Sequence, residues 1–326
     1  MWAALFPGQG SQTVGMGRFL YDQFPQAKQA FEEASDTLKQ DFKKLCFEGP
    51  ESDLALTENT QPALLLVSTA TFRVIEHEMG VTIGAAAGHS IGEYAAVVAG
   101  GAVAFADALR AVRVRGRAMQ KAVPVGQGAM AAVMGLTDEQ VTRLCAWVRE
   151  ASGETLEPAN FNAPGQVVIS GKSAAIAWLK ENTARLGEAF PEGAPRLKMI
   201  PLAVSAPFHC SLMKPAEEEM RLVLKETAFQ GSRIPIVQNV TAKETRDANT
   251  LRDNLVKQVS GAVRWTQCMA RLKDLGMSNA IEFGAGKVLS GLSKKIDSSA
   301  PSPFNINALE DIKTLEAAVK SAATVH

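Results

Sequence analysis

Short apolar runs alternate with longer amphipathic stretches at both ends of the chain. In the first part, Trp2–Phe6 and Ile83–Gly88 are strand-like, and helical patterns fill the intervals up to Met79 and on to Val123. The pattern resumes later with three more expected strands, Ile234–Val240, Ala280–Phe283 and Phe304–Asn307. Buried strands that alternate with helices are typical of a parallel sheet covered by helices. We therefore expect residues 1–124 and 201–326 to form one α/β body.

The middle of the chain shows a different order of elements. The expected elements are a strand Ala129–Gly135, a helix Asp138–Ala151, strands Leu156–Phe161 and Gln166–Ser170, a helix Ala174–Glu188 and a strand Leu197–Val204. This βαββαβ order is that of the ferredoxin-like unit, and Ala163–Gly165 supplies the turn between its middle strands. We expect residues 125–200 to form a small inserted subdomain, and a ligand to bind in the groove beside it.

The composition is that of an ordinary folded protein and argues against several classes of partner. Hydrophobic residues make up 46% of the 326 residues and charged residues 21%, which is enough apolar material for a large core. Lys+Arg and Asp+Glu both number 34, so neither nucleic acid nor an anionic membrane is expected as a partner. The apolar stretch Tyr94–Ala106 is shorter than the roughly 20 residues that span a bilayer.

The cysteines and the start of the chain indicate a reducing compartment. The four cysteines lack the paired spacing of a metal site, so we expect buried thiols and no metal; they are Cys46, Cys145, Cys210 and Cys268. The first strand begins at Trp2, without the basic region and cleavage site of a signal peptide. We therefore expect a mature, cytoplasmic protein.

A G-x-S-x-G motif lies at the junction of an expected strand and an expected helix. Gly88 and Gly92 allow a sharp turn that lifts the Ser90 hydroxyl above the sheet, and the Ile91 N–H then becomes an oxyanion-hole donor. The alternative is a chance match or a serine that merely caps a helix. The strand before the motif and the apolar helix after it favour a nucleophile.

A serine nucleophile needs a base, and the chain has four histidines. His77 lies on a charged helix face, His89 is expected to point away from the serine, and His326 is the last residue. His209 lies in a loop after the last strand of the inserted unit, where a side chain can face the groove. We therefore expect His209 to act as the base, against the alternative of a structural histidine.

The group that orients this histidine stays open at this point. A carboxylate is the usual third member of such a site. Four aspartates are available and nothing in their local sequence favours one of them: Asp107, Asp138, Asp247 and Asp253.

Five segments together resemble malonyl-CoA:acyl-carrier-protein transacylases, in an order that runs nearly end to end. They are Phe6–Gln12, Gly88–Glu93, Asn160–Gln166, Pro207–His209 and Glu282–Leu289. The resemblance implies a hydrolase-like main body with a ferredoxin-like insertion, in agreement with the patterns above. It also implies transfer of a malonyl group from malonyl-CoA to an acyl carrier protein for fatty acid synthesis, in the cytoplasm, by a monomer without a metal or other cofactor.

The same resemblance assigns roles to individual residues. Ser90 would carry the acyl group, His209 would be its base, and Gln9 would support the oxyanion hole. The backbone carbonyl of Gln258 would orient the histidine, which would explain why no carboxylate stands out.

A malonyl group also requires a cation for its free carboxylate, and arginine suits a bidentate pair best. In the helix Ala106–Val123, Arg113 and Arg115 each lie roughly 80° from the centre of the buried stripe, so periodicity does not choose between them. The family's carboxylate-binding arginine directly precedes a glycine, and Arg115 precedes Gly116. In related polyketide acyltransferases a bulky residue at the position of Phe208 accompanies malonyl.

Three other functions remain as alternatives: a serine esterase or thioesterase, an acyltransferase of polyketide assembly, and an inactive module that binds carrier proteins. Gly8-Gln9-Gly10 also suggests a phosphate loop, but Thr13 stands where the dinucleotide motif requires glycine. Packing between a loop and a helix is the better interpretation there.

Overall fold

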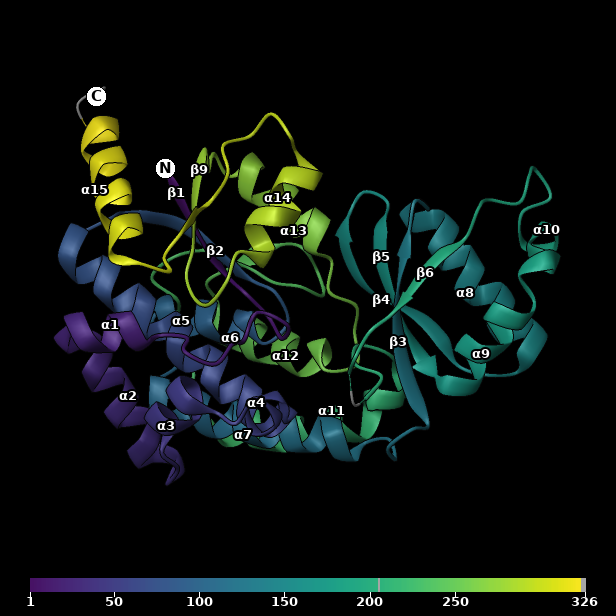
Figure 1. Cartoon of the computed structure of the whole chain (residues 1–326), viewed down its shortest axis with the longest axis horizontal. Coiled ribbons are helices and arrows are strands. Elements are labelled where there is room, and N and C mark those ends of the chain that lie inside the picture. Colours follow the sequence, from purple (N-terminus) through teal and green to yellow (C-terminus); the bar gives the residue numbers. More distant parts are fainter. Residues whose placement is uncertain (205, 324–326) are drawn as a thin grey trace.

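Two apolar strands lie at the centre of a six-stranded sheet in the larger part of the molecule (Figure 1). The computed structural model describes residues 1–204 and 206–323. The strand order is β10-β9-β1-β2-β7-β8, and every pair is parallel except β7 with β8. The bounds are β1 Trp2–Phe6, β2 Ile83–Gly88, β7 Ile236–Val237, β8 Glu244–Thr245, β9 Asn279–Glu282 and β10 Phe304–Asn305. The expected α/β body with a largely parallel sheet is confirmed.

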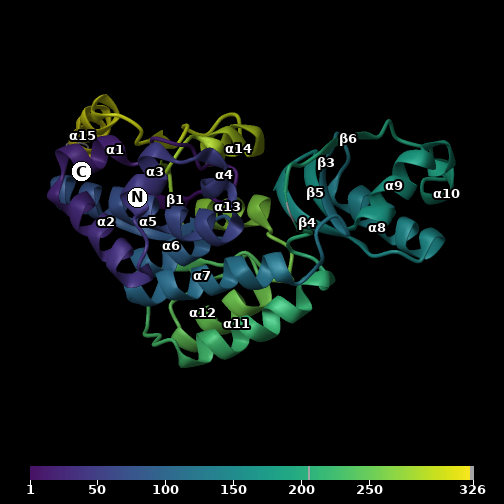
Figure 2. The ribbon, with the colours of Figure 1, turned by 60° about the horizontal axis from the view of Figure 1, so that its bottom comes forward.

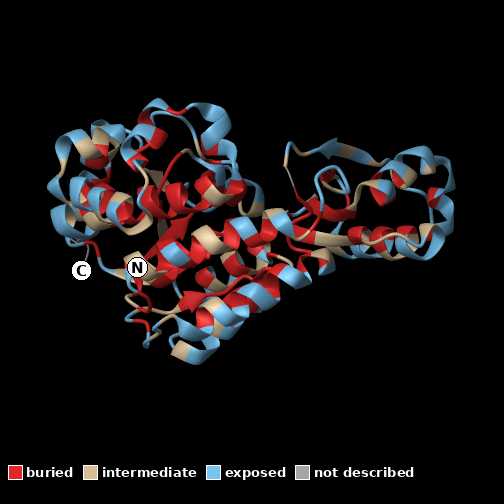
Figure 3. Ribbon diagram, turned by 90° about the horizontal axis from the view of Figure 1, so that it is seen from below, coloured by how far each residue is buried: buried red, intermediate tan, exposed pale blue. Residues whose placement is uncertain are grey.

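Helices from both parts of the chain cover this sheet, with their buried residues turned inward (Figure 3). Those of the first part are α1 Arg18–Gln23, α2 Pro25–Leu38, α3 Phe42–Glu48, α4 Glu51–Ala55, α5 Thr57–Met79, α6 Gly92–Ala99 and α7 Phe105–Lys121. Those of the second part are α11 Lys214–Glu226, α12 Ala248–Gln258, α13 Trp265–Asp274, α14 Val288–Ile296 and α15 Leu309–Ala323. A 3-10 turn, Ser211–Met213, precedes α11.

Strand β1 is apolar throughout because both faces of the sheet are buried. Ala4 and Phe6 belong to the core formed with α5, α6 and α7. Ala3 and Leu5 point to the opposite face, where Trp265 of α13 lies in the same buried cluster. Such two-sided burial accounts for a continuous apolar run in place of an alternating one.

Two of the later strands are shorter than expected. Only Ile236–Val237 pairs in the first of them, because the Ile234 carbonyl accepts the Ser232 hydroxyl at 2.6 Å and the chain then turns into β8. In the last strand, pairing ends at Asn305. Asn307 instead accepts the Gly286 N–H through its side chain at 3.1 Å.

The middle of the chain forms a smaller lobe with a four-stranded antiparallel sheet of order β4-β5-β3-β6 (Figure 1). Its elements are β3 Gly128–Met134, α8 Asp138–Ser152, β4 Leu156–Ala163, β5 Gln166–Lys172, α9 Ser173–Glu181, α10 Leu186–Ala189 and β6 Lys198–Pro201. Figures 1 and 2 both show α8, α9 and α10 on the side of this sheet that faces away from the main body. The expected β-α-β-β-α-β order is therefore present.

The two faces of the small sheet belong to different cores. Val133 and Ile169 pack with α8 and α9 in a core of the lobe. Met130, Ala132 and Val168 point the other way and belong to the same buried cluster as α5, α6 and α7 of the main body. The lobe is therefore packed against the body by apolar side chains.

Two expected elements of the lobe end early. The helix expected over Ala174–Glu188 stops at Glu181, where the Asn182 side chain donates to the Trp178 carbonyl at 2.8 Å and competes with the helical bonds. A 3-10 turn, Thr183–Arg185, and α10 follow. Strand β6 ends at Pro201, after which the Val204 N–H donates to the Leu202 carbonyl and closes a tight turn.

Among the described helices none is long and apolar enough to cross a membrane.

Candidate active site

Ser90 lies at the turn between β2 and α6, which is the context that the G-x-S-x-G motif requires. Its φ is +52°, in the left-handed region that few side chains adopt. The flanking glycines allow this turn: a Cβ on Gly88 would lie 2.0 Å from the Gly92 carbonyl carbon, and a Cβ on Gly92 would lie 2.1 Å from the Phe6 carbonyl oxygen. Larger residues would therefore force the turn open.

The imidazole of His209 contacts the serine directly. Ser90 Oγ and His209 Nε2 are 2.7 Å apart. On the other side of the ring, Nδ1 lies 2.9 Å from the Gln258 carbonyl and 3.2 Å from the Gly261 carbonyl. Carbonyl oxygens only accept, so Nδ1 carries the hydrogen and Nε2 is left to accept the Ser90 O–H. This is the tautomer that a general base requires.

Burial keeps this base neutral. His209 is 4% exposed, and burial, followed by repulsion from Arg115, lowers the pKa of its imidazole to about 3. The backbone carbonyls that accept from Nδ1 oppose this shift but do not outweigh it. The ring is therefore unprotonated at neutral pH, and its Nε2, at 2.7 Å from Ser90 Oγ, has a lone pair free to accept the serine proton.

The contact to Nδ1 comes from the end of a helix. Gln258 is the last residue of α12, where carbonyls have no partner within the helix and can accept from a side chain. The four aspartates that the sequence left open serve elsewhere. Asp107 pairs with Arg110, Asp138 accepts from Gln267, Asp247 caps α12 at Thr250, and Asp253 pairs with Arg252.

Arg115 is buried beside the serine. It is 1% exposed, and its guanidinium donates to Gln61 Oε1 at 2.9 Å, to Gln258 Oε1 at 2.9 Å and to Ser90 Oγ at 3.2 Å. All three acceptors are neutral, and within the described part of the chain no ion pair includes Arg115. Its positive charge therefore remains available to a bound anion.

The structure separates the two arginines that periodicity could not distinguish. Arg113 donates to Asn59 at 3.1 Å and to Gln40, and its guanidinium lies 5.6 Å from the centre of the Phe42 ring. These partners belong to the helical layer and not to the surroundings of Ser90. Only Arg115 of the pair faces the serine.

A cavity of 330 Å³ opens above Ser90, between the main body and the small lobe. Gln9 lines it from the loop after β1, and its Nε2 lies 3.5 Å from Thr57 Oγ1. Phe208, at 7% exposure, forms part of the wall. Ile91 also lines the cavity, and its N–H donates to no acceptor among the described residues. All seven residues singled out from the sequence thus lie at or beside one cavity.

Comparison with known proteins identifies the family. The model of the acyl transferase domain matches residues 4–296. The malonyl CoA-acyl carrier protein transacylase of Bacillus subtilis is 42% identical over 319 residues, covering 98% of this chain and 96% of the relative. This chain belongs to the malonyl CoA-acyl carrier protein transacylase family. The malonyl CoA-acyl carrier protein transacylase of Escherichia coli K12 is also 42% identical, and the match covers 90% of this chain and 92% of the relative. The resemblance drawn from the sequence is confirmed.

Solved structures of transacylases have the same fold. FabD from Acinetobacter baumannii superposes with a TM-score of 0.90 at 41% identity, covering 98% of both chains. The malonyl CoA-acyl carrier protein transacylase of Clostridium perfringens gives a TM-score of 0.91 at 33% identity, covering 99% of this chain and 98% of the other. A further match, with a TM-score of 0.88 at 41% identity over 97% of this chain and 99% of the other, is a malonyl-transacylase in complex with a type II PKS acyl-carrier protein.

In this member of the transacylase family, sequence reasoning missed two buried residues that hold the site. Gln61 of α5 accepts from Arg115. Asn239 accepts the Ser90 N–H at 2.8 Å and donates to the Gly88 carbonyl at 2.7 Å, so it clamps the turn of the nucleophile. A signal for Asn239 existed, because it lies two residues after the apolar strand β7, and ligand sites of parallel sheets form at the carboxyl ends of strands.

The other histidines and the cysteines do not contribute reactive groups. His89 Nε2 lies 2.8 Å from Asn162 Oδ1, directed away from Ser90 as expected, and His77 pairs with Glu78 near solvent. His326 lies outside the described residues. The four cysteines are buried and unpaired, and burial raises the pKa of Cys46 to about 12, so this thiol stays protonated.

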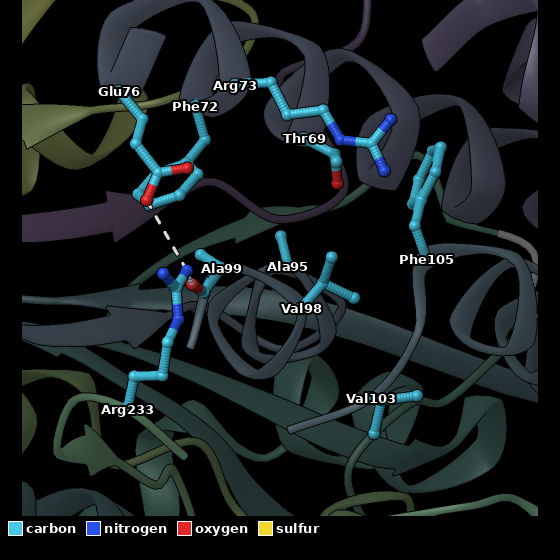
Figure 4. A pocket seen from close by; sticks show the side chains of 10 residues that line it. All are labelled: Thr69, Phe72, Arg73, Glu76, Ala95, Val98, Ala99, Val103, Phe105 and Arg233. Atoms are coloured by element: carbon cyan, nitrogen blue, oxygen red, sulfur yellow. Dashed lines mark hydrogen bonds and ion pairs between the residues drawn. The ribbon is translucent and has the colours of Figure 1, made fainter. Parts of the chain in front are cut away.

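A second cavity, of 190 Å³, is lined mainly by side chains of α5 and α6 (Figure 4). Ala95, Val98 and Ala99 of α6 form its apolar floor. Its two arginines already have anionic partners: Arg73 pairs with Glu33 at 2.9 Å, and Arg233 with Glu76 at 3.5 Å. No nucleophile paired with a base lines this cavity, so the cavity above Ser90 is the candidate active site.

Proposed function

We propose that this protein transfers the malonyl group of malonyl-CoA to the phosphopantetheine thiol of an acyl carrier protein, through a malonyl ester of Ser90, for fatty acid synthesis. One observation carries the proposal. The Ser90 hydroxyl lies 2.7 Å from a neutral imidazole and 3.2 Å from a buried guanidinium that pairs with no carboxylate of the described residues. The first neighbour activates a nucleophile, and the second binds an acid group beside it.

In the first half-reaction His209 Nε2 takes the Ser90 proton as Oγ attacks the thioester carbonyl. Gln9 and the Ile91 N–H donate to the oxygen that becomes negative. The C–S bond then breaks, the imidazolium returns the proton to the sulfur, and coenzyme A leaves. The Gln258 carbonyl keeps the ring oriented and stabilises its charged form.

In the second half-reaction the thiol of the carrier protein repeats these steps in the opposite direction. His209 takes the thiol proton, the sulfur attacks the ester carbonyl, and Ser90 recovers its hydrogen as the acyl group departs. Neither half-reaction changes an oxidation state, so the proposed mechanism uses no metal or redox cofactor. Relatives named as acyl carrier protein transacylases, one of them in complex with such a protein, support this partner.

Arg115 gives the site its preference for malonyl. A guanidinium can form two parallel hydrogen bonds to a carboxylate, and a buried site strengthens them. Gln61 and Gln258 fix the position of the guanidinium and leave its charge uncompensated by contact. Phe208 limits the space beside the acyl carbon and so disfavours branched groups.

The finer architecture is part of the same proposal. Residues 125–200 form a ferredoxin-like subdomain inserted into a hydrolase-like body of residues 1–124 and 201–326, supported by the β4-β5-β3-β6 sheet order. We further propose that the protein acts as a cytoplasmic monomer and binds neither nucleic acid nor a membrane. Equal numbers of acidic and basic residues, 34 of each, support the last point.

Intact-mass spectrometry after mixing with malonyl-CoA tests the nucleophile. A malonyl adduct that persists in water and is absent in Ser90→Ala supports the transferase. Rapid loss of the adduct to water would indicate a thioesterase instead, and no adduct at all would indicate a module that only binds carrier proteins.

Kinetics with two acyl donors test the role of Arg115. Arg115→Ala should reduce malonyl transfer about 100-fold more than acetyl transfer, since only malonyl offers a carboxylate to the buried cation. Arg113→Ala is the matched control, because Arg113 lies two residues before Arg115 on the same helix and contacts Asn59 and Gln40 instead of Ser90, and it should reduce both transfers equally. Equal losses in Arg115→Ala would refute the assignment, and a selective loss in Arg113→Ala would transfer it to that residue.

A further inference from the structure

A second charge is buried close to the reactive serine. Glu93 lies in the first turn of α6, is 0% exposed and does not line the cavity above Ser90. Its carboxylate accepts three hydrogen bonds, from Gln238 Nε2 at 3.0 Å, the Asn239 N–H at 2.7 Å and Gln258 Nε2 at 3.1 Å. All three donors are neutral. A fully buried charge without a cation in contact is costly, so its presence calls for a reason.

Two of its three donors belong to residues that hold the reactive groups. Asn239 clamps the turn at Ser90 through its side chain, while its backbone N–H donates to Glu93. Gln258 orients His209 through its backbone carbonyl and holds Arg115 through Oε1, while its Nε2 donates to Glu93. A single carboxylate therefore connects the supports of the nucleophile, the base and the arginine.

The charges on either side of Gln258 also fix which way its amide points. Arg115 can only donate and Glu93 in its ionised form can only accept, so Oε1 must face the arginine and Nε2 the glutamate. Nε2 then also donates to the Ser90 carbonyl at 3.0 Å. The neutral amide separates the two charges, so that Glu93 attracts Arg115 without occupying the guanidinium that a substrate acid would bind.

We propose that Glu93 is a positioning residue that holds Asn239 and Gln258, and through them aligns Ser90 and His209 and leaves Arg115 free for an acidic acyl group. The part that concerns Arg115 rests on the proposed function. Burial raises the pKa of Glu93 to about 7, and the three donors and Arg115 oppose that rise. Each of the three contacts donates to the carboxylate, which is the arrangement that its ionised form accepts.

Glu93→Gln tests the proposal, because it keeps the shape and replaces one acceptor oxygen with a donor. The chain offers a matched control in Glu282, which is also 0% exposed and accepts from the N–H groups of Leu289 and Ser290, at the end of β9. Glu282→Gln makes the same chemical change with no contact to Asn239 or Gln258. Both variants are expected to lose stability.

Two measurements, each corrected for the folded fraction, separate positioning from stability. The first is the rate at which a serine-directed fluorophosphonate labels Ser90, which needs no malonyl group. The second is the ratio of malonyl to acetyl transfer. Glu93→Gln should slow labelling about 10- to 100-fold, the scale on which outer hydrogen-bond partners act in metal sites, and should also lower the ratio. Glu282→Gln should change neither.

Wild-type labelling and an unchanged ratio in Glu93→Gln would overturn the proposal, as would equal losses in the two variants. If Glu93→Gln does not fold, Gln238→Met removes one donor to Glu93, and a lowered labelling rate supports the proposal while an unchanged rate overturns it. Failure of the proposed function has a different signature, because the wild-type protein would then label normally and transfer no malonyl.

Discussion

Replacing His209 with glutamine should change how the stability of the protein depends on pH. In the native state the pKa of His209 is lowered to about 3, by burial and by the nearby charge of Arg115, from an ordinary value of 6.5. Between these values the unfolded chain binds a proton that the native state does not. The neutral imidazole therefore stabilises the native state above the ordinary pKa, and this contribution is lost as the pH falls toward the native pKa.

The size of the effect follows from the two pKa values. At about pH 5 the native histidine is still neutral, whereas the unfolded one is almost fully protonated. This protonation stabilises the unfolded state and lowers the free energy of unfolding by about 2 kcal/mol relative to about pH 8. A glutamine at position 209 does not titrate. The difference in unfolding free energy, wild type minus His209→Gln, should therefore fall by about 2 kcal/mol between these two conditions.

Urea denaturation of both proteins at the two pH values, at constant ionic strength, measures this difference. Glu93 shifts stability in the opposite direction, because its pKa is raised, but it is present in both proteins and cancels. A difference that stays constant or grows on acidification would show that the native imidazole takes up a proton, and would refute the neutral base.

Two further predictions concern the backbone and the wall of the cavity. Because Ser90 has a φ of +52°, the Ser90→Gly variant should be about 1 kcal/mol more stable than Ser90→Ala. Both variants lack the hydroxyl, so the comparison isolates the backbone. Equal midpoints of urea unfolding would argue against strain at this turn. Phe208→Ala should raise methylmalonyl transfer relative to malonyl about 10-fold in a competition assay with both donors, since the ring lines the cavity. An unchanged ratio would show that another residue sets the limit.

Local patterns were sufficient for the strand β2 and for the turn that carries Ser90. The apolar run before Ser90 and the two glycines around it determine the turn almost by themselves, so the sequence predicted the strand, the turn and the helix that follows. The same holds for the β-α-β-β-α-β order of the lobe. Periodicity overestimated the length of α9, because the helix ends where the Asn182 side chain bonds to the Trp178 carbonyl.

Contacts between distant segments were not predictable in this way. Helix α7 approaches the start of α5 so closely that a Cβ on Gly116 would lie 2.7 Å from the Glu58 Cα. This close approach accompanies the inward orientation of Arg115, and an ideal helical wheel contains no such information. The carbonyl that orients His209 belongs to the backbone, so no residue type marks it, and only the family resemblance pointed to Gln258.

The apolar contact between the small sheet and the main body limits how substrates can enter. Met130 and Val168 are buried in the same cluster as the helices of the body. Swinging the lobe away as a rigid unit would expose these side chains to water, at roughly 25 cal/mol for each Å² uncovered. The acyl donor and the carrier's thiol must then both enter a cleft of nearly constant width, so turnover should proceed without a large hinge motion.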